Sequence, residues 1–304
     1  MKLKTKNLLT LSELSKNEFL QIINYSIKLK KESKHGTTKP LLKNKTLAMI
    51  FQKPSTRTRV SFEVGMFQLG GQAINLSSND MQLSRGESIQ DTSKTLSRYV
   101  DGIMARVYDH ILLEELSAFS TVPVINGLSN SFHPCQILAD FMTIKEKKKK
   151  LKGLKIAWIG DGNNVCNSMI YGCALAEMKM AIATPKGFEP IKNVVNEAVK
   201  STEIEVTNDP SKAIKNADVV VTDTFISIHN NDPKRSKKFL PKFQVNSNLM
   251  SHAKPDAIFM HCLTAKREQE VTSSVIDGPQ SVVWDEAENR LHTQKALLVF
   301  LLRA

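Results

Sequence analysis

Hydroxyl and guanidinium groups are densest in residues 54–59, which read PSTRTR. This segment lies between an apolar run at 47–51 and a helical pattern that includes Phe62, Met66 and Leu69. The start of a helix is electropositive and arginine offers a forked pair of donors, so the combination suits a phosphate group. A helix cap with exposed arginines would give the same pattern, and the spacing alone leaves both interpretations open.

A second polar group occurs at 132–136 (FHPCQ), where another helix is expected to begin. His133 and Gln136 are three residues apart and therefore face the same side of that helix. They could hydrogen-bond a polar ligand, or His133 could simply cap the helix. A metal is not indicated, because no second ligand follows at i+4. Arg106 ends an expected strand at 103–106, and open α/β sheets bind ligands at such strand ends.

Residues 160–164 (GDGNN) follow an expected strand at 155–159 and begin like a dinucleotide-binding fingerprint. The third glycine would fall at position 165, which is valine, and no acid follows the next expected strand where a ribose would bind. These departures argue against a nicotinamide cofactor. What remains is a strand–turn–helix crevice into which two asparagine amides could point.

Three further segments place polar side chains at the ends of expected strands or at the entry to a helix. Asp223 and Ser227 are four residues apart and could hold an amino group, or could serve as turn caps. Cys262 could be a nucleophile, a polar contact or a small buried residue. Arg290 could contact a ligand or carry a charge on the helix surface. The residue types leave these alternatives open.

The composition is typical of a globular protein of about two domains. The chain has 304 residues, of which 41% are hydrophobic and 24% charged, and its net charge is +12. This charge permits anionic partners. However, the lysine-rich run at 145–152 (KEKKKKLK) has no interleaved aromatic residues, so it predicts a linker at the domain boundary and no nucleic-acid partner.

The sequence also bears on the compartment. Four cysteines in 304 residues are too few for a disulfide scaffold, and free thiols fit a reducing environment. None of them forms a CxxC pair, which argues against structural zinc. The N-terminus lacks the apolar run of a signal peptide, and no stretch approaches the roughly 18 apolar residues of a membrane span. We therefore expect a cytoplasmic protein with no membrane partner.

Short apolar runs alternate with helical patterns along the whole chain. This alternation predicts an α/β fold in which parallel sheets are covered by helices. The first helix is expected to begin with a capping box of Ser15 and Glu18. Strands are expected at 47–51, 73–76, 103–106, 122–125, 155–159, 180–183, 204–207, 219–222 and 258–260.

Taken together, these segments resemble the aspartate/ornithine carbamoyltransferase family over nearly the whole chain. The segments that carry the resemblance are, in order, KPSTRTRVSFEVG (53–65), LSRGESIQDT (83–92), MARVY (104–108), FHPCQILADF (132–141), WIGDGNNVCNS (158–168), ATPKGFEP (183–190), TDTFIS (222–227), HCL (261–263) and EAENR (286–290). The first and fourth are typical of carbamoyl phosphate users in general, whereas GDGNN, DxxxS and HCL indicate ornithine as the acceptor.

The resemblance implies two α/β domains, each a parallel sheet flanked by helices, bridged by helices that include the C-terminal one. Residues 1–147, with the C-terminal helix at about 290–304 packing back on them, would bind carbamoyl phosphate, and residues 151–289 would bind L-ornithine. The implied reaction transfers the carbamoyl group to the δ-amine of ornithine, giving citrulline and phosphate in arginine biosynthesis, without a cofactor or metal. A homotrimer, or a larger assembly of trimers with active sites at subunit interfaces, is also implied.

The resemblance also assigns roles to individual residues. The implied carbamoyl phosphate cradle is Ser55, Thr56, Arg57 and Thr58, with Arg106, His133, Pro134, Cys135 and Gln136 at the carbamoyl end. Gln82 would reach the phosphate bound by a neighbouring subunit. The implied ornithine site is Asn164, Asp223, Ser227 and Ile228, and residues closing over both substrates are Cys262, Leu263 and Arg290. The implied catalytic residues are Arg57, Arg106, His133 and Cys262, of which Cys262 would position the amine rather than attack the carbonyl.

Two segments depart from the family pattern on the acceptor side. The usual Ser-Met-Gly is Ser227, Ile228 and His229 here, and the usual His-Cys-Leu-Pro ends in Thr264. The second departure leaves open whether the Leu263–Thr264 peptide bond is cis. The alternatives to ornithine transfer are therefore a carbamoyltransferase acting on a modified ornithine or a diamine, and a catalytically silent paralogue that binds carbamoyl phosphate.

Overall fold

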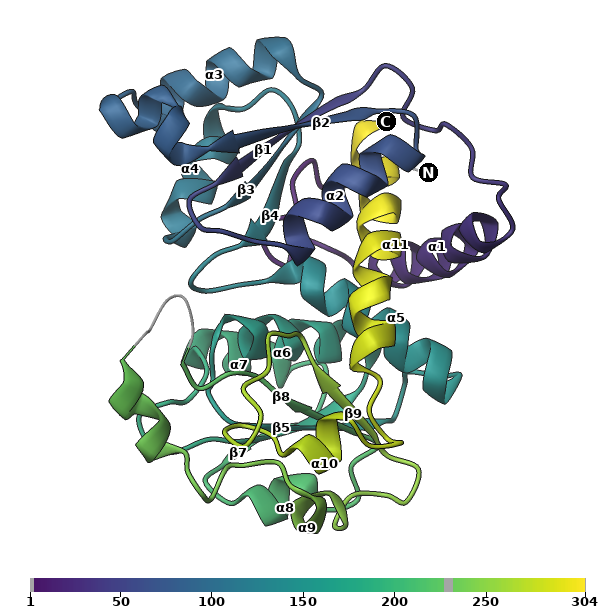
Figure 1. The fold of residues 1–304 in the computed structure, drawn as a ribbon, viewed down its shortest axis with the longest axis vertical. Coiled ribbons are helices and arrows are strands. Elements are labelled where there is room, and N and C mark those ends of the chain that lie inside the picture. Colours follow the sequence, from purple (N-terminus) through teal and green to yellow (C-terminus); the bar gives the residue numbers. More distant parts are fainter. Residues whose placement is uncertain (1–2, 227–231, 304) are drawn as a thin grey trace. The chain divides into compact units, whose positions relative to one another are not determined.

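The computed structural model describes residues 3–226 and 232–303, so Ser227, Ile228 and His229 lie outside the described residues. The chain forms two compact units (Figure 1). Unit 1 comprises Met1–Met142 and Glu288–Ala304, and unit 2 comprises Thr143–Ala287. Two helices, α5 (Pro134–Lys148) and α11 (Val283–Leu302), contribute residues to both units.

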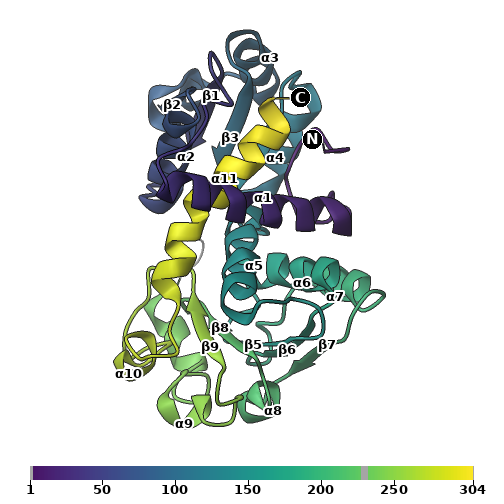
Figure 2. The ribbon, with the colours of Figure 1, turned by 90° about the vertical axis from the view of Figure 1, so that its right-hand side faces the viewer.

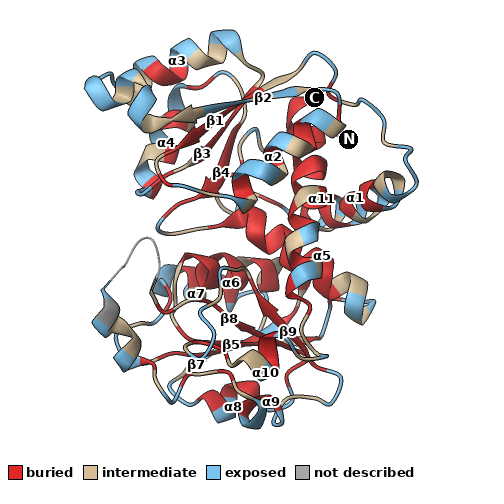
Figure 3. Ribbon diagram, in the orientation of Figure 1, coloured by how far each residue is buried: buried red, intermediate tan, exposed pale blue. Residues whose placement is uncertain are grey.

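Unit 1 is built on a parallel sheet in the order β2-β1-β3-β4. Its strands are β1 (Thr46–Phe51), β2 (Gln72–Ser77), β3 (Gly102–Arg106) and β4 (Val124–Leu128). Figure 3 shows β1, β3 and β4 as buried, whereas the edge strand β2 is exposed or half-buried along its length. The buried strands read as continuous apolar runs because both faces of a parallel sheet are covered.

The sheet of unit 1 is accompanied by helices that carry several of the predicted site residues. These elements are α1 (Lys16–Lys34), α2 (Arg57–Gln68), η1 (Ser78–Asp80), η2 (Gln82–Arg85), α3 (Ile89–Tyr99) and α4 (His110–Phe119). The predicted capping box is confirmed, because Glu18 and Ser15 exchange side-chain and backbone hydrogen bonds at the start of α1. Helix α1 crosses α11 in Figures 1 and 2, and Lys30 Nζ donates to Asn289 Oδ1 at 2.7 Å.

Unit 2 is built on a second parallel sheet, in the order β7-β6-β5-β8-β9. Its strands are β5 (Lys155–Ile159), β6 (Lys179–Ala183), β7 (Ile204–Thr207), β8 (Val219–Thr222) and β9 (Ile258–His261). The helices are α6 (Asn164–Ala176), α7 (Lys192–Ala198), α8 (Pro210–Ile214), η3 (Pro233–Lys238), α9 (Ser247–Met250) and α10 (Ser273–Ile276). An apolar core that includes Phe225, Phe239 and Phe259 packs within this unit.

In both sheets the chain adds strands first on one side and then on the other. The order reverses beside β1 in unit 1 and beside β5 in unit 2. Open α/β sheets bind ligands at the carboxyl ends of the strands that flank such a reversal. In unit 1 these strands are β1 and β3, where Phe51 is in register with Arg106. In unit 2 they are β5 and β8, where Trp158 is in register with Val221.

The predicted α/β class is confirmed, because each strand expected from the sequence exists and both sheets are parallel. The largest difference is in β4, which runs from Val124 to Leu128 instead of over the expected 122–125. Pro123 lacks the N–H group that would extend the ladder. Within the described ranges 3–226 and 232–303, we find no helix that is long and apolar enough to cross a membrane.

Candidate active site

Unit 1 brings two arginines and a threonine together at the start of α2. The Thr58 oxygen Oγ1 accepts long hydrogen bonds from Arg106 Nη1 at 3.4 Å and from Arg290 Nη2 at 3.3 Å. Only 1% of Thr58 and 2% of Arg290 is exposed. Two guanidinium groups that meet on one hydroxyl repel each other, so an anion bound between them would relieve the repulsion. The positive N-terminus of α2 attracts the same anion.

Helix α5 joins this cluster through Gln136. Arg290 Nη1 donates to Gln136 Oε1 at 2.7 Å, and Gln136 Nε2 donates to Asp140 Oδ1 at 2.8 Å. His133 is buried directly before α5, where its carbonyl accepts from the Gln136 backbone N–H. The predicted donor-side residues on α5 and α11 are therefore connected by a direct hydrogen bond between two buried side chains.

The other two predicted residues at the start of α5 are also buried. Pro134 is the first residue of the helix, and the Cys135 Sγ donates to the Asn126 carbonyl at 3.4 Å. Burial raises the pKa of the Cys135 thiol to about 12, so the thiol stays protonated. The observed role of Cys135 is packing at the end of β4, and its contact with carbamoyl phosphate stays a prediction.

A cavity of about 410 Å³ lies beside the start of α2. Ser55 and Thr56 of the predicted cradle line it, together with residues from the end of β2. Lys53 also lines the cavity, and its Nζ lies 3.6 Å from the centre of the Tyr108 ring. Burial and the neighbouring Arg106 lower the pKa of Lys53 to about 8. The cavity therefore has a cationic wall at neutral pH.

Arg57 and Gln82 carry side chains that reach solvent. Arg57 is half-buried at the first position of α2, beside the positive end of that helix. Gln82 is exposed in η2. A contact with a neighbouring subunit requires an exposed side chain, and this contact stays a prediction for Gln82.

Unit 2 places Asp223 at the end of β8 within a group of hydrogen-bond donors. Asp223 Oδ1 accepts from the Thr224 backbone N–H at 2.8 Å and from Cys262 Sγ at 3.3 Å. Asp223 Oδ2 accepts from Asn163 Nδ2 at 2.7 Å. Asp223 is 7% exposed, and Cys262 is half-buried. The structure thus brings together Asp223 and Cys262, which the sequence placed in one site.

Asn163 orients this carboxylate from the turn that follows β5. Its Oδ1 caps α6 by accepting from the backbone N–H groups of Val165 and Cys166 at 3.0 and 3.1 Å. The cap fixes the amide, so that Nδ2 points at Asp223. The predicted residue Asn164 is the first residue of α6 and is 8% exposed.

A second carboxylate of the same turn, Asp161, is paired with a cation. Asp161 Oδ2 accepts from Arg235 Nη2, and Arg235 Nε donates to the Phe225 carbonyl at 2.9 Å. The guanidinium carbon lies 4.5 Å from the centre of the Phe188 ring. Burial raises the pKa of Asp161, Arg235 opposes this, and Asp223 adds to the increase. Arg235 therefore neutralises a carboxylate that is close enough to Asp223 to repel it.

His261 supports the segment that carries Cys262. The Leu263 backbone N–H donates to His261 Nδ1 at 2.9 Å, so Nδ1 carries no proton and Nε2 does. Nε2 faces Glu270 Oε1 at 3.2 Å, and both side chains are fully buried. Asp223, His261 and Cys262 lie close enough to hold a metal ion, with ligand atoms within 4.8 Å of one another. Because both ring nitrogens of His261 are engaged, a metal would have to displace one of these hydrogen bonds, and we assign none here.

Comparison with known proteins shows that both parts of the chain match models of one protein family. Residues 6–146 match the family model described as "Aspartate/ornithine carbamoyltransferase, carbamoyl-P binding domain", and residues 152–301 match "Aspartate/ornithine carbamoyltransferase, Asp/Orn binding domain". An ornithine carbamoyltransferase from Cenarchaeum symbiosum is 61% identical over 301 residues, covering 99% of each chain. The chain belongs to the aspartate/ornithine carbamoyltransferase family.

Solved structures of this carbamoyltransferase family share the fold. The ornithine carbamoyltransferase from Pyrococcus furiosus gives a TM-score of 0.94 at 52% identity, covering 97% of this chain and 96% of its own. An anabolic ornithine carbamoyltransferase from Campylobacter jejuni gives a TM-score of 0.91 at 42% identity, covering 99% of each chain. The predicted membership of this family is therefore confirmed.

Of the departures from the family pattern, the structure describes only the one at Thr264. The Leu263–Thr264 peptide bond is cis, and Leu263 has a φ of 55°. The sequence had left this bond open between cis and trans. The predicted acceptor residues Ser227 and Ile228, and the departure at His229, lie outside the described residues.

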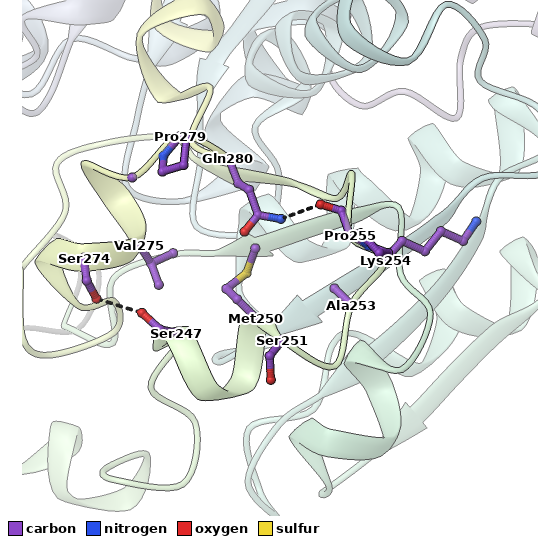
Figure 4. A pocket seen from close by; sticks show the side chains of 11 residues that line it. Ser247, Met250, Ser251, Ala253, Lys254, Pro255, Ser274, Val275, Pro279 and Gln280 are labelled. Atoms are coloured by element: carbon purple, nitrogen blue, oxygen red, sulfur yellow. Dashed lines mark hydrogen bonds between the residues drawn. The ribbon is translucent and has the colours of Figure 1, made fainter.

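A separate cavity of about 480 Å³ lies in unit 2 between α9 and α10 (Figure 4). Ser247 and Ser274 hydrogen-bond across it at 3.0 Å, and Met250 and Gln280 also line it. None of the residues lining it is among the predicted site residues or connects to Asp223 and Cys262 by the hydrogen bonds described above. We therefore place the candidate site of unit 2 at the ends of β5, β8 and β9.

Several residues of the two half-sites were missed by sequence reasoning. Asn163 could have been found, because an asparagine just before a helix is a typical N-cap. Lys53 precedes the PSTRTR motif, but a lysine there gives no sign of burial. Arg235 and Asp161 are 74 residues apart, and Asp140 is connected to the predicted residue Arg290 through Gln136. No local spacing predicts such pairs.

Proposed function

We propose that this chain transfers the carbamoyl group of carbamoyl phosphate to the δ-amine of L-ornithine, giving L-citrulline and phosphate. The observation that carries the proposal is the convergence of the half-buried Arg106 and the buried Arg290 on Thr58 at the start of α2. Such a site favours a small, doubly charged donor. In unit 2, the carboxylate and thiol of Asp223 and Cys262 suit a primary amine.

On the donor side, the reaction develops negative charge at two places. Attack on the carbonyl carbon forms a C–N bond and an oxyanion, for which Arg106, His133 and Thr58 are the proposed donors. Cleavage of the C–O bond then releases phosphate, which Arg57 and the N-terminus of α2 stabilise. The two substrates react directly once they are held together, so no covalent intermediate with the enzyme is needed.

On the acceptor side, the amine must lose a proton before it can attack. With a pKa of about 10.4, only about one alkyl amine in a thousand is neutral near pH 7.4. Asp223 accepts a hydrogen bond from the neutral amine and thereby orients its lone pair toward the carbonyl. Cys262 donates its S–H to Asp223. A thiol in that state is a positioning group rather than a nucleophile.

The proposal includes the division of labour between the two parts of the chain. Residues 1–147 and 290–304 bind carbamoyl phosphate, and residues 151–289 bind ornithine. The proposed donor contacts are Ser55, Thr56, Arg57, Thr58, Gln82, Arg106, His133, Pro134, Cys135, Gln136, Cys262, Leu263 and Arg290. The proposed ornithine contacts are Asn164, Asp223, Ser227 and Ile228. The descriptions of the two matched family models support this division.

We also propose a homotrimer, with Gln82 reaching the phosphate in a neighbouring subunit. The exposed apolar side chains Val60 and Phe67, which line one surface hollow of α2, support an interface there, since large exposed apolar patches mark contact surfaces. Arginine biosynthesis is the proposed pathway, supported by the anabolic relative from Campylobacter jejuni. All four cysteines are thiols rather than disulfides, which supports the cytoplasm as the compartment.

The test is a colorimetric citrulline assay with carbamoyl phosphate and ornithine. We expect saturable formation of citrulline with release of equal amounts of phosphate. An acceptor panel that includes N-acetylornithine and putrescine tests the choice of acceptor, because a ureido product from either, but not from ornithine, would overturn ornithine as the substrate. Binding of carbamoyl phosphate without turnover on any amine would instead identify a silent paralogue.

A further inference from the structure

Helix α11 carries a buried glutamine one turn after Arg290 that the sequence motifs do not single out. Gln294 is 1% exposed and contacts both Arg290 and α2. We propose that Gln294 is a positioning residue for carbamoyl phosphate: its amide holds the Arg290 guanidinium and the first turn of α2 in one arrangement before the donor binds. This inference rests on the proposed function.

Both ends of the Gln294 amide are in use. Its Oε1 accepts from Arg290 Nε at 3.0 Å, and its Nε2 donates to Ser61 Oγ at 2.7 Å. A guanidinium N–H can only donate, so a flipped amide would face Arg290 with the wrong group. The amide therefore has one favourable orientation, set by a buried cation.

Ser61 extends this connection to the end of α2 that faces the proposed phosphate. Ser61 Oγ donates to the Arg57 carbonyl at 2.6 Å, one helical turn earlier. Arg57 and Thr58 are the first two residues of α2. Figures 1 and 2 show α11 running past α2, and the Gln294–Ser61 hydrogen bond joins them at this turn. One amide thus ties the Arg290 guanidinium to the turn that carries Arg57 and Thr58.

The hydrogen bonds of Arg290 explain why the Gln294 contact should affect the binding of an anion. Its three nitrogens donate in three directions: Nε to Gln294, Nη1 to Gln136 and Nη2 to Thr58. A guanidinium binds an anion well only when its fork is aimed in advance. Without Gln294, the guanidinium can rotate about its long axis and turn Nη2 away from Thr58. We therefore expect weaker donor binding, with a much smaller effect on the chemical step.

A second contact between the same two helices provides a matched control. Lys295 Nζ donates to Gln68 Oε1 at 2.8 Å, and Lys295 is fully buried. Gln68 is the last residue of α2, about 16 Å along the helix from Arg57. Replacing Lys295 therefore perturbs the packing of α11 on α2 without reaching the proposed donor site.

The experiment compares Gln294→Met, Ser61→Ala, the double variant and the control Lys295→Met. The KM for each substrate, kcat and the melting temperature are measured for each protein. Binding of carbamoyl phosphate alone, and of inorganic phosphate, is titrated by calorimetry. Gln294→Glu is added because it keeps an acceptor for Arg290 but cannot donate to Ser61, and it remains informative if the methionine variant fails to fold.

We expect Gln294→Met to weaken carbamoyl phosphate binding about tenfold, with the KM for ornithine and kcat changed less than about threefold. Ser61→Ala should have a smaller effect of the same kind and add little in the double variant. Lys295→Met should lower the melting temperature without weakening donor binding. Unchanged donor binding in both Gln294 variants, or equal losses in Gln294→Met and Lys295→Met, would overturn the proposal. If the wild type makes no citrulline, the proposed function fails, and the two titrations still decide the role of Gln294.

Discussion

The proposed donor half-site in unit 1 and the proposed acceptor half-site in unit 2 are stabilised in opposite ways. In unit 1, buried side chains from α2, α5 and α11 meet the half-buried Arg106 of β3, and the cluster has an excess of positive charge. In unit 2, Asp223 sits at a strand end and accepts hydrogen bonds from three donors. An anion would offset the positive charge of the first arrangement, whereas in the second the carboxylate already accepts three hydrogen bonds.

This difference predicts how substitutions in each half-site should affect substrate binding. A cluster of like charges destabilises the folded protein until its ligand arrives, which is a common property of functional sites. Variants there should act directly on anion binding. In unit 2 the amine must take over hydrogen bonds that the protein makes to itself, so variants should act on orientation. The substrate whose binding or kcat/KM changes therefore reports which half has been altered.

The largest effect is expected from Arg57→Gln, which removes charge at the positive end of α2. We expect about a 10³-fold loss of citrulline formation, because loss of an arginine that stabilises phosphoryl charge typically has this size. The matched control is Arg98→Gln, which replaces an exposed arginine in the last turn of α3. We expect the control to lose less than about tenfold. Near-normal turnover by Arg57→Gln would contradict the donor site.

The next effect tests the acceptor half through Asp223→Asn. The amide can still accept from Asn163 but offers no charge to the amine, so kcat/KM for ornithine should fall about 10²-fold. Calorimetric binding of carbamoyl phosphate alone should stay within about twofold of the wild type. If donor binding fell as much as acceptor use, the two half-sites would not be separable in the way that their hydrogen bonds indicate.

Sequence reasoning predicted the elements and the strand-end motifs well, for a local reason. Each strand is a short apolar run bounded by polar turns, and Ser15 with Glu18 is a cap that involves only neighbouring residues. Thr58 and Asp223 could be identified because helix starts and strand ends are visible in the sequence. Their exact hydrogen-bond partners were not predictable from spacing.

The parts that the sequence did not predict depend on contacts between distant segments. Gln294 and Ser61 are 233 residues apart, and Arg235 and Asp161 are 74 apart. Each of these residues has an ordinary surface interpretation within its own helix or turn. Whether such a residue belongs to a site depends on its burial, and its burial depends on which helices pack together. The strand β4 shows the same limit on a smaller scale, since it begins after Pro123 and continues to Leu128, beyond the apolar run that predicted it.

A third, smaller effect concerns the neutralisation of Asp161. In Arg235→Met, a buried carboxylate close to Asp223 loses its cation, and we expect the KM for ornithine to rise about tenfold. Carbamoyl phosphate binding should not change. The double variant Asp161→Asn, Arg235→Met removes the uncompensated charge and should recover most of the loss. If the double variant were as weak as Arg235→Met alone, Arg235 would act through its contacts with Phe225 and Phe188 instead.

The smallest effect is a pH dependence confined to the donor half. Burial and Arg106 lower the pKa of Lys53 to about 8, so its ammonium is mostly charged at pH 7 and mostly neutral at pH 9. Since Lys53 lines the cavity beside Ser55 and Thr56, carbamoyl phosphate binding should weaken about fivefold over this interval. Titration without ornithine avoids the opposing deprotonation of the amine.

Two variants of Lys53 sharpen this last test. Lys53→Arg keeps its charge at both pH values, so its donor affinity should not change between pH 7 and 9. Lys53→Met should bind weakly at both. If Lys53→Arg kept the full pH dependence of the wild type, the titrating group would lie elsewhere. Lys53 would then contribute little to the binding of carbamoyl phosphate. The positive charge that distinguishes the proposed donor half-site from the acceptor half-site would come from Arg106 and Arg290 instead.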